Sequence, residues 1–256
     1  RDDSWAEAEK SRIGEERFRR EHECEFLIFD ETLINSITLA DMEGVPPVET
    51  TGQVRWFKRP TPGHTYLVSL DPSMGTGGDY AAIQIFELPT FEQIGEWHHN
   101  QTPMNQQVRI LQGINKHIHD TIMEKDSTAT PQIFYSMENN TIGEAALMRV
   151  MDIGEENIMG MFLSEPIRKG HRRKFRRGFN TTAKHKIDAC TKFKELVEGG
   201  KMKINSQLLI SEMKDFVASG LSYKAKPGQH DDLVSSCLLM TRMMKVLADF
   251  DPKIFE

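Results

Sequence analysis

Acidic residues stand at three places where strands or helices are expected to begin or end. Asp71 ends the β-rich run YLVSLD, and Glu138 follows the run QIFYSM. Asp231 and Asp232 open the last expected helix. Carboxylates from separate elements supply the hard oxygen ligands that Mg²⁺ prefers. Two such ions about 3.5–4 Å apart can hydrolyse a phosphodiester, so the pattern points to two-metal phosphoryl chemistry.

Each acid also has a plain structural explanation. Asp71 fits a turn residue, and Glu138 fits a solvated strand end. Asp231 or Asp232 fits a helix N-cap. The metal hypothesis is favoured by the combination of the three positions and not by any one of them. Asp79 closes the Gly-rich turn that follows Asp71, where it is predicted to be an auxiliary ligand or an outer partner of the site.

A basic stretch between residues 166 and 187 contains no acid, although the whole chain has a formal net charge of −6. A pI near 5.9 by itself argues against a nucleic-acid partner. That argument fails because the positive charge is concentrated in this one stretch. Its guanidinium groups suit phosphate oxygens, and Phe175 and Phe179 are interleaved with them. A solvated loop is the plain alternative. We expect contacts to the DNA backbone, without base readout, from Arg168, Lys169, Arg172, Arg173, Lys174, Arg176, Arg177, Lys184 and Lys186.

The elements expected to position these residues form an α/β domain. Three runs after His64 predict consecutive antiparallel strands joined by short turns, at 66–71, 80–86 and 91–98. Later elements alternate: a helix after Thr102-Pro103, a strand at 132–137, a helix opened by a Thr141/Glu144 capping box, a strand at 157–163 and a helix from Thr182. A helix at 206–217 and a last helix from about Asp231 follow. The order β-β-β-α-β-α-β-α predicts a central mixed sheet flanked by helices.

Length and composition bound the remaining possibilities. A chain of 256 residues with 38% hydrophobic residues fits one large domain, or one domain plus an appendage. Residues 31–63 are rich in Gly and Pro and predict a linker with one short strand at 53–58. Cys24, Cys190 and Cys237 are too far apart for a CxxC site or a disulfide framework, which predicts a reducing compartment. The sequence contains neither a membrane-spanning run nor a signal peptide, and the missing initiator Met predicts a fragment.

Three segments carry a resemblance to a known family. They are SLDPSMGTGGDYAAI (69–83), YSMENNTIG (135–143) and YKAKPGQHDDLV (223–234). In this order they resemble the nuclease domain of the large terminase subunit of tailed bacteriophages, T-even-like ones most closely. The resemblance extends from His64 to Lys245. It implies an RNase H/retroviral integrase-like fold and an endonuclease that cuts concatemeric double-stranded DNA, with little sequence preference, at the start and end of headful packaging.

The resemblance also implies roles for particular residues. It maps the catalytic triad to Asp71, Glu138 and one of Asp231 and Asp232, of which Asp231 is favoured and Asp232 is expected as a further ligand. With Asp79 as the auxiliary ligand predicted above, these residues are expected to bind two Mg²⁺ or Mn²⁺ ions. Residues 1–63 then correspond to the end of the preceding ATPase domain plus a linker, and residues 64–256 to the nuclease domain. Because Walker A and B motifs are missing from the sequence, ATPase activity is not carried over.

The implied partners are double-stranded DNA, the portal of the procapsid, the small terminase subunit and the protein's own ATPase domain. The implied location is the cytoplasm of the infected host, without a membrane. Two other classes are weighed against this reading. An actin- or sugar-kinase-like phosphotransferase would need a duplicated domain and an adenosine motif. A non-catalytic docking module for DNA or the portal would not need clustered carboxylates, which repel phosphates unless metals neutralise them.

Overall fold

Strands at the centre of the molecule are buried on both faces, as expected where helices cover both sides of a sheet. The computed structural model describes residues 3–14, 18, 31–166 and 177–250. The antiparallel strands are β3 (Thr65–Asp71), β4 (Ala81–Leu88) and β5 (Glu92–His99), and β6 (Gln132–Met137) pairs with β3 in parallel. Over the described residues the sheet order is β1-β2-β5-β4-β3-β6-β7, which confirms the predicted mixed sheet.

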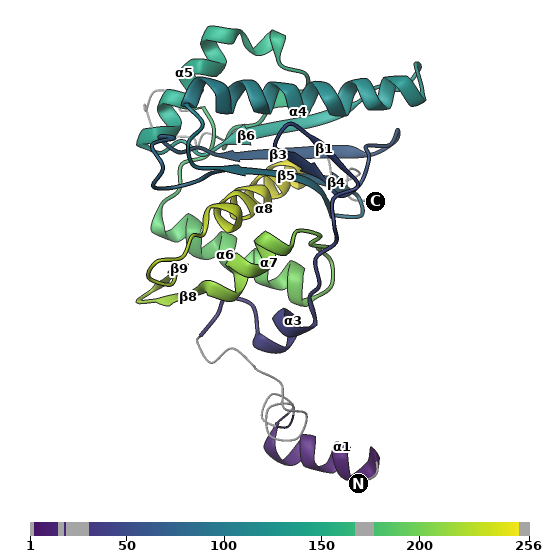
Figure 1. Ribbon diagram of the computed structural model, residues 1–256, viewed down its shortest axis with the longest axis vertical. Helices are drawn as coiled ribbons and strands as arrows, with labels where there is room; N and C mark the ends of the chain where they lie inside the picture. The colour runs from purple at the N-terminus through teal and green to yellow at the C-terminus, as the bar shows by residue number, and fades with distance from the viewer. Residues whose placement is uncertain (1–2, 15–17, 19–30, 167–176, 251–256) are drawn as a thin grey trace.

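Helices lie on both faces of this sheet (Figure 1). One face carries α4 (Met104–Lys125) and α5 (Thr141–Ile153), and the buried side chains of α4 recur at the spacing of one helical face. The other face carries α6 (Ala183–Glu198), α7 (Gln207–Asp215) and α8 (Asp232–Phe250). Two apolar cores result, one on each side of the sheet.

Residues before 64 take part in the same sheet and core. The strands β1 (Glu49–Thr51) and β2 (Val54–Trp56) extend the sheet, with β2 pairing with β5. Leu39 of α3 (Ser36–Asp41) is buried in the core on the α7 side. Residues 31–63 therefore pack with the α/β domain. The helix α1 (Asp3–Ile13) precedes them, and the assignment of residues 1–63 to a preceding domain stays a prediction.

Some local elements differ from the sequence predictions. Asn140, and not Thr141, caps α5, because its side chain accepts a hydrogen bond from the amide of Gly143 at 2.7 Å. The strand predicted at 157–163 is only β7 (Met161–Phe162), preceded by a 3₁₀ turn, Glu155–Asn157. A hairpin of β8 (Phe216–Ser219) and β9 (Ser222–Ala225) begins where the sequence predicts the end of a helix. Among the described helices, none has the length and apolar character needed to cross a membrane.

Candidate metal centre

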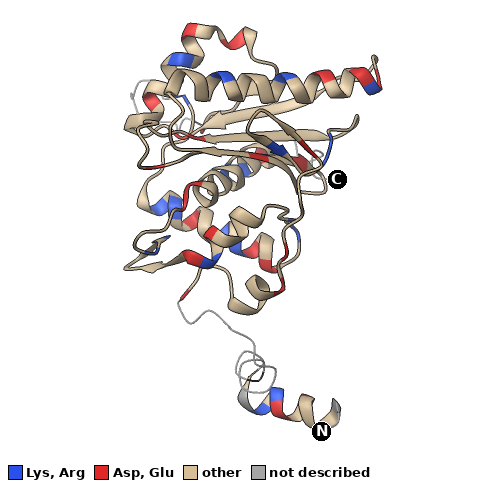
Figure 2. Cartoon of the chain, viewed as in Figure 1, with Lys and Arg blue, Asp and Glu red and all other residues tan. Residues whose placement is uncertain are grey.

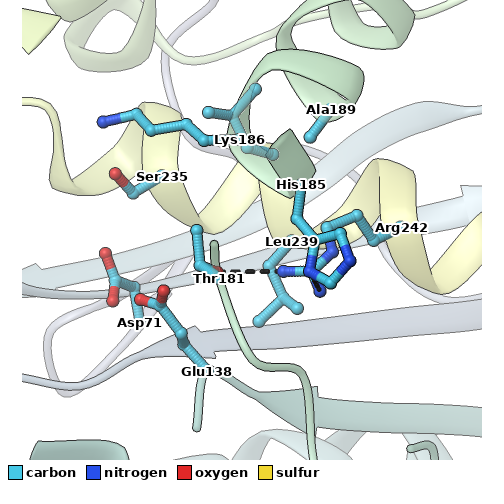
Figure 3. A pocket seen from close by; sticks show the side chains of 10 residues that line it. Asp71, Glu138, Thr181, His185, Lys186, Ala189, Ser235, Leu239 and Arg242 are labelled. Carbon is cyan, nitrogen blue, oxygen red and sulfur yellow. Dashed lines mark hydrogen bonds between the residues drawn. The ribbon is translucent and has the colours of Figure 1, made fainter. Parts of the chain in front are cut away.

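Asp71 and Glu138 lie side by side because β3 and β6 are parallel neighbours (Figure 3). The carboxyl ends of parallel strands meet at one edge of a sheet, where open α/β sheets bind ligands. Asp71 is the last residue of β3, and Glu138 follows β6 with its amide donating to the carbonyl of Leu70 at 3.3 Å. Asn140 donates to the Glu138 carboxylate at 3.1 Å.

The start of α8 brings two more carboxylates to this edge. Asp231 occupies the N-cap position of α8, since its carbonyl accepts from the amide of Ser235 at 2.7 Å. Its Oδ2 atom accepts from the amide of Ala225 at 3.3 Å and lies 3.9 Å from Nζ of Lys186. Asp232 is the first residue of α8. Both acids are close enough to Asp71 to raise its pKa.

The electrostatics of Asp71 reflect this crowding. Burial raises its pKa well above the ordinary value, and the carboxylates of Glu138, Asp232 and Asp231 raise it further. Burial, and next Asp231, raises the pKa of Asp232 to about 6. Asp79 contributes to the same increase at Asp232, although the Asp79 side chain itself is exposed. The site therefore concentrates negative charge that protein cations only partly compensate.

A cavity of about 130 Å³ opens beside Asp71 and Glu138. Lys186 and His185 reach it from the first turn of α6, and Ser235 and Arg242 reach it from α8 (Figure 3). Cations in the first turn of a helix are disfavoured by its dipole. The interaction of Lys186 with the helix dipole is therefore unfavourable, whereas its interaction with an anionic ligand beside the carboxylates would be favourable.

Arg242 connects Glu165, just before the basic stretch, with the second half of that stretch. Its guanidinium pairs with Glu165, and it donates to the carbonyl of Asn180 at 3.0 Å and to the hydroxyl of Thr181 at 2.9 Å. The amide of Glu165 donates to the carbonyl of Gly178 at 3.2 Å. Glu165 and residues 178–181 are thereby held next to the carboxylates.

The predicted DNA contacts divide into two groups. Arg168, Lys169, Arg172, Arg173, Lys174 and Arg176 lie outside the described residues. Arg177 pairs with Glu155 and lies over the ring of Phe162 at 5.7 Å, so its charge is already matched within the chain. Lys184 and Lys186 are in the first turn of α6. Elsewhere Figure 2 shows basic and acidic residues mixed along the helices and not separated onto opposite faces.

The residues fit a divalent cation by the chemistry of their donors. Within the described ranges, no three His, Cys, Asp or Glu side chains form a ready-made coordination group. Burial and the neighbouring carboxylates nevertheless raise the pKa of Asp71 and of Asp232, and an added cation would relieve this repulsion. An all-carboxylate set favours Mg²⁺ or Mn²⁺ over softer metals.

Comparison with known proteins identifies the family. A family model for the terminase RNase H-like domain matches residues 68–243. The chain belongs to this family. This result confirms the predicted RNase H-like fold and the resemblance to terminases, while the closer likeness to T-even-like phages stays a prediction.

Solved structures share the fold of this terminase domain. The large terminase nuclease of thermophilic phage G20c with bound magnesium is 17% identical, with a TM-score of 0.60 over 84% of this chain and 97% of that chain. The Thermus phage P74-26 large terminase nuclease domain is also 17% identical, with a TM-score of 0.56 over 79% and 90%. The Mn-soaked, inhibitor-bound human cytomegalovirus terminase nuclease domain is 14% identical, with a TM-score of 0.52 over 85% and 95%.

Several polar residues around the terminase site were not singled out by the sequence. Glu212 of α7 hydrogen-bonds to the start of α8. Ser69 and Ser236 form a buried hydroxyl pair between β3 and α8. Glu165 and Arg242 form the ion pair described above. Nothing in their local sequence distinguishes them from surface residues, because each acts through a partner far away along the chain.

Proposed function

We propose that this terminase domain is a metal-dependent DNA endonuclease that hydrolyses phosphodiester bonds. The observation that carries the proposal is the meeting of carboxylates from β3, β6 and the start of α8 beside a cavity that Lys186 also lines. Three separate elements contribute acids to one half-buried place, which costs stability unless a cation binds there.

The proposed roles follow from these positions. Asp71, Glu138 and Asp231 would hold two Mg²⁺ or Mn²⁺ ions, and Asp232 and Asp79 would support them. The ions would supply an activated water and stabilise the leaving oxygen of the scissile phosphate. Lys186, 3.9 Å from Asp231, would hold a phosphate oxygen at the mouth of the site. Attack in line needs no covalent intermediate on the protein.

Phosphate contacts away from the site would come from the basic stretch. Arg168, Lys169, Arg172, Arg173, Lys174, Arg176, Arg177, Lys184 and Lys186 would bind the backbone of double-stranded DNA. Contacts of this kind carry no sequence information, which fits cleavage with little sequence preference. Glu165 and Arg242 support this proposal because they hold the start and the second half of the stretch near the carboxylates.

Membership of the terminase family supports a role in viral DNA packaging. We infer that the domain cuts concatemeric DNA when headful packaging begins and ends, in the cytoplasm of the infected host. Its partners would be the portal, the small terminase subunit and an ATPase domain in the same protein. Residues 1–63 would contain the end of that ATPase domain and the linker.

Nicking of supercoiled plasmid tests the catalytic proposal. The wild-type chain should nick in Mg²⁺ or Mn²⁺ and not in EDTA, and Asp71→Asn and Glu138→Gln should lose at least a hundredfold in rate. Asp152→Asn is the matched control, because this exposed acid of α5 pairs with Arg149 on the same helix. Equal nicking by wild type and Asp71→Asn would show that these carboxylates are not catalytic and would favour a docking module.

A further inference from the structure

The first turn of α8 is capped by a side chain from another helix. The amides of Leu233 and Val234 have no partner within their own helix, as in any first turn. Both donate to Oε2 of Glu212, at 2.9 Å and 3.1 Å. Glu212 belongs to α7, whose own N-terminus is capped by Ser206. The cap of α8 therefore comes from outside the helix.

This arrangement changes what Asp231 can do. An Asp at the N-cap ordinarily turns its carboxylate onto the amides of the second and third helical residues. Here Glu212 already satisfies those amides, at Leu233 and Val234. The Asp231 carboxylate instead accepts from the amide of Ala225 and faces Lys186. The acid that would otherwise cap its helix thus lies beside Lys186, which lines the cavity.

Glu212 is itself held from several sides. Its side chain is only 10% exposed, and its Oε1 atom lies 3.7 Å from Nε2 of His98 on β5. The His98 ring stacks on Tyr80 with 4.1 Å between ring centroids. The backbone of Tyr80 in turn acts on Asp232, whose pKa it lowers. A packed group of side chains therefore connects Glu212 to the surroundings of Asp232.

We propose that Glu212 is a positioning residue of the metal centre. By capping α8 from α7, it frees the Asp231 carboxylate for the cation and fixes the direction in which Asp231 and Asp232 leave the helix. Glu212 need not touch the metal or the substrate. The proposal rests on the proposed function, because it concerns the use of Asp231 as a ligand.

Substitutions at Glu212 separate capping from charge. In Glu212→Ala, the exposed amides would recruit the Asp231 carboxylate as an ordinary N-cap and withdraw it from the cavity. Glu212→Gln keeps an oxygen that can accept both amides, so it should retain the wild-type arrangement. Glu212→Asp keeps the charge but is one methylene shorter, so it should behave like Glu212→Ala.

Mn²⁺ affinity, measured by titration calorimetry on the full chain without DNA, tests the proposal. Loss of a residue that orients a metal ligand typically weakens binding 10–100-fold. We expect a loss of about that size for Glu212→Ala and Glu212→Asp and a change below about threefold for Glu212→Gln. Asn35→Ala is the matched control. Asn35 caps α3 by accepting from the amide of Thr38 at 2.8 Å, so this variant loses a helix cap away from the acids.

The outcomes distinguish this proposal from the proposed function. Wild-type Mn²⁺ affinity in Glu212→Asp, or equal losses in Glu212→Gln and Glu212→Ala, would overturn the positioning role while leaving the nuclease proposal intact. Failure of the wild-type chain to bind Mn²⁺ or to nick plasmid would instead overturn the nuclease proposal. Thermal unfolding without metal shows whether each variant is folded, and Glu212→Asp and Glu212→Gln keep the test decisive if Glu212→Ala does not fold.

Discussion

The hydroxyl of Ser69 lies 2.8 Å from the hydroxyl of Ser236, buried between β3 and α8. Each hydroxyl is also close to the other residue's carbonyl, at 2.9 Å and 3.1 Å. Side chains alternate along a strand, so Ser69 and Asp71 share one face of β3. Ser236 lies in the turn of α8 that follows Asp231. This pair therefore fixes the strand carboxylate relative to the helix carboxylates.

A double-mutant cycle on this pair should show strong coupling. Ser69→Ala and Ser236→Ala should each destabilise the fold by about 1 kcal/mol. The two changes should be non-additive by about 0.5–3 kcal/mol, because both remove the same contact. Plasmid nicking should fall in each variant. Urea denaturation measures the coupling. The control cycle combines Ser69→Ala with Thr191→Ala, an exposed position of α6, and should be additive. Additive losses in the first cycle would refute the coupling.

Stability without metal should rise as pH falls from about 8.5 to about 6.5. Burial raises the pKa of Glu212 to about 8, and burial with Asp231 raises that of Asp232 to about 6. In this window the folded protein takes up protons that the unfolded carboxylates bind only near pH 4. Burial lowers the pKa of His98 to about 4. This lowered pKa makes acidification destabilising, but only below about pH 6.5, where His98 takes up a proton in the unfolded chain and not in the folded one.

Melting temperatures in EDTA check this dependence. The metal-free chain should melt higher at pH 6.5 than at pH 8.5, and Glu212→Gln should reduce the difference. Excess Mg²⁺ should stabilise more at pH 8.5, since the cation binds ionised carboxylates in competition with protons. A melting temperature that falls or stays level on acidification would mean that the ionised carboxylates of Glu212 and Asp232 do not destabilise the metal-free fold.

Arg242→Lys should destabilise the domain although the charge is kept. The planar guanidinium contacts Glu165, Asn180 and Thr181 together, and an ammonium cannot match that geometry. We expect a loss of about 1–3 kcal/mol, measured by urea denaturation. Arg149→Lys changes an exposed pair within α5 and should cost less than about 0.5 kcal/mol. Equal losses of stability in the two variants would contradict the importance of the planar guanidinium geometry at Arg242.

Much of the sheet was predictable because its strands are short, apolar and bounded by turns. The run predicted at 132–137 is β6, and the run predicted at 66–71 differs from β3 by one residue. Asp71 and Glu138 could be singled out for the same reason, since both stand where such a run ends. Parallel pairing of β3 with β6 then places them together without further information.

The supporting contacts could not be predicted, because they depend on tertiary packing. Glu212 is one acid on an amphipathic helix, and its pattern does not reveal that α7 crosses the start of α8. The position of Asp231 does predict an N-cap. In the structure the Asp231 carbonyl accepts the first bond of the helix, but the side chain that caps the helix belongs to Glu212. A charge run also cannot reveal that one of its members, Arg177, pairs with Glu155.

Reversing charge in the basic stretch should weaken DNA binding without unfolding the domain. The triple variant Arg172→Glu/Arg173→Glu/Arg176→Glu leaves Arg177 in place, because reversing Arg177 would also repel Glu155. Each lost phosphate contact should make the slope of log affinity against log salt less steep by about 0.9, so three contacts change it by about 2.7. Fluorescence anisotropy with a labelled duplex across a salt series measures this slope. Arg109→Glu, an exposed position on α4, should leave it unchanged, and an unaltered slope in the triple variant would exclude the stretch as a phosphate-binding surface.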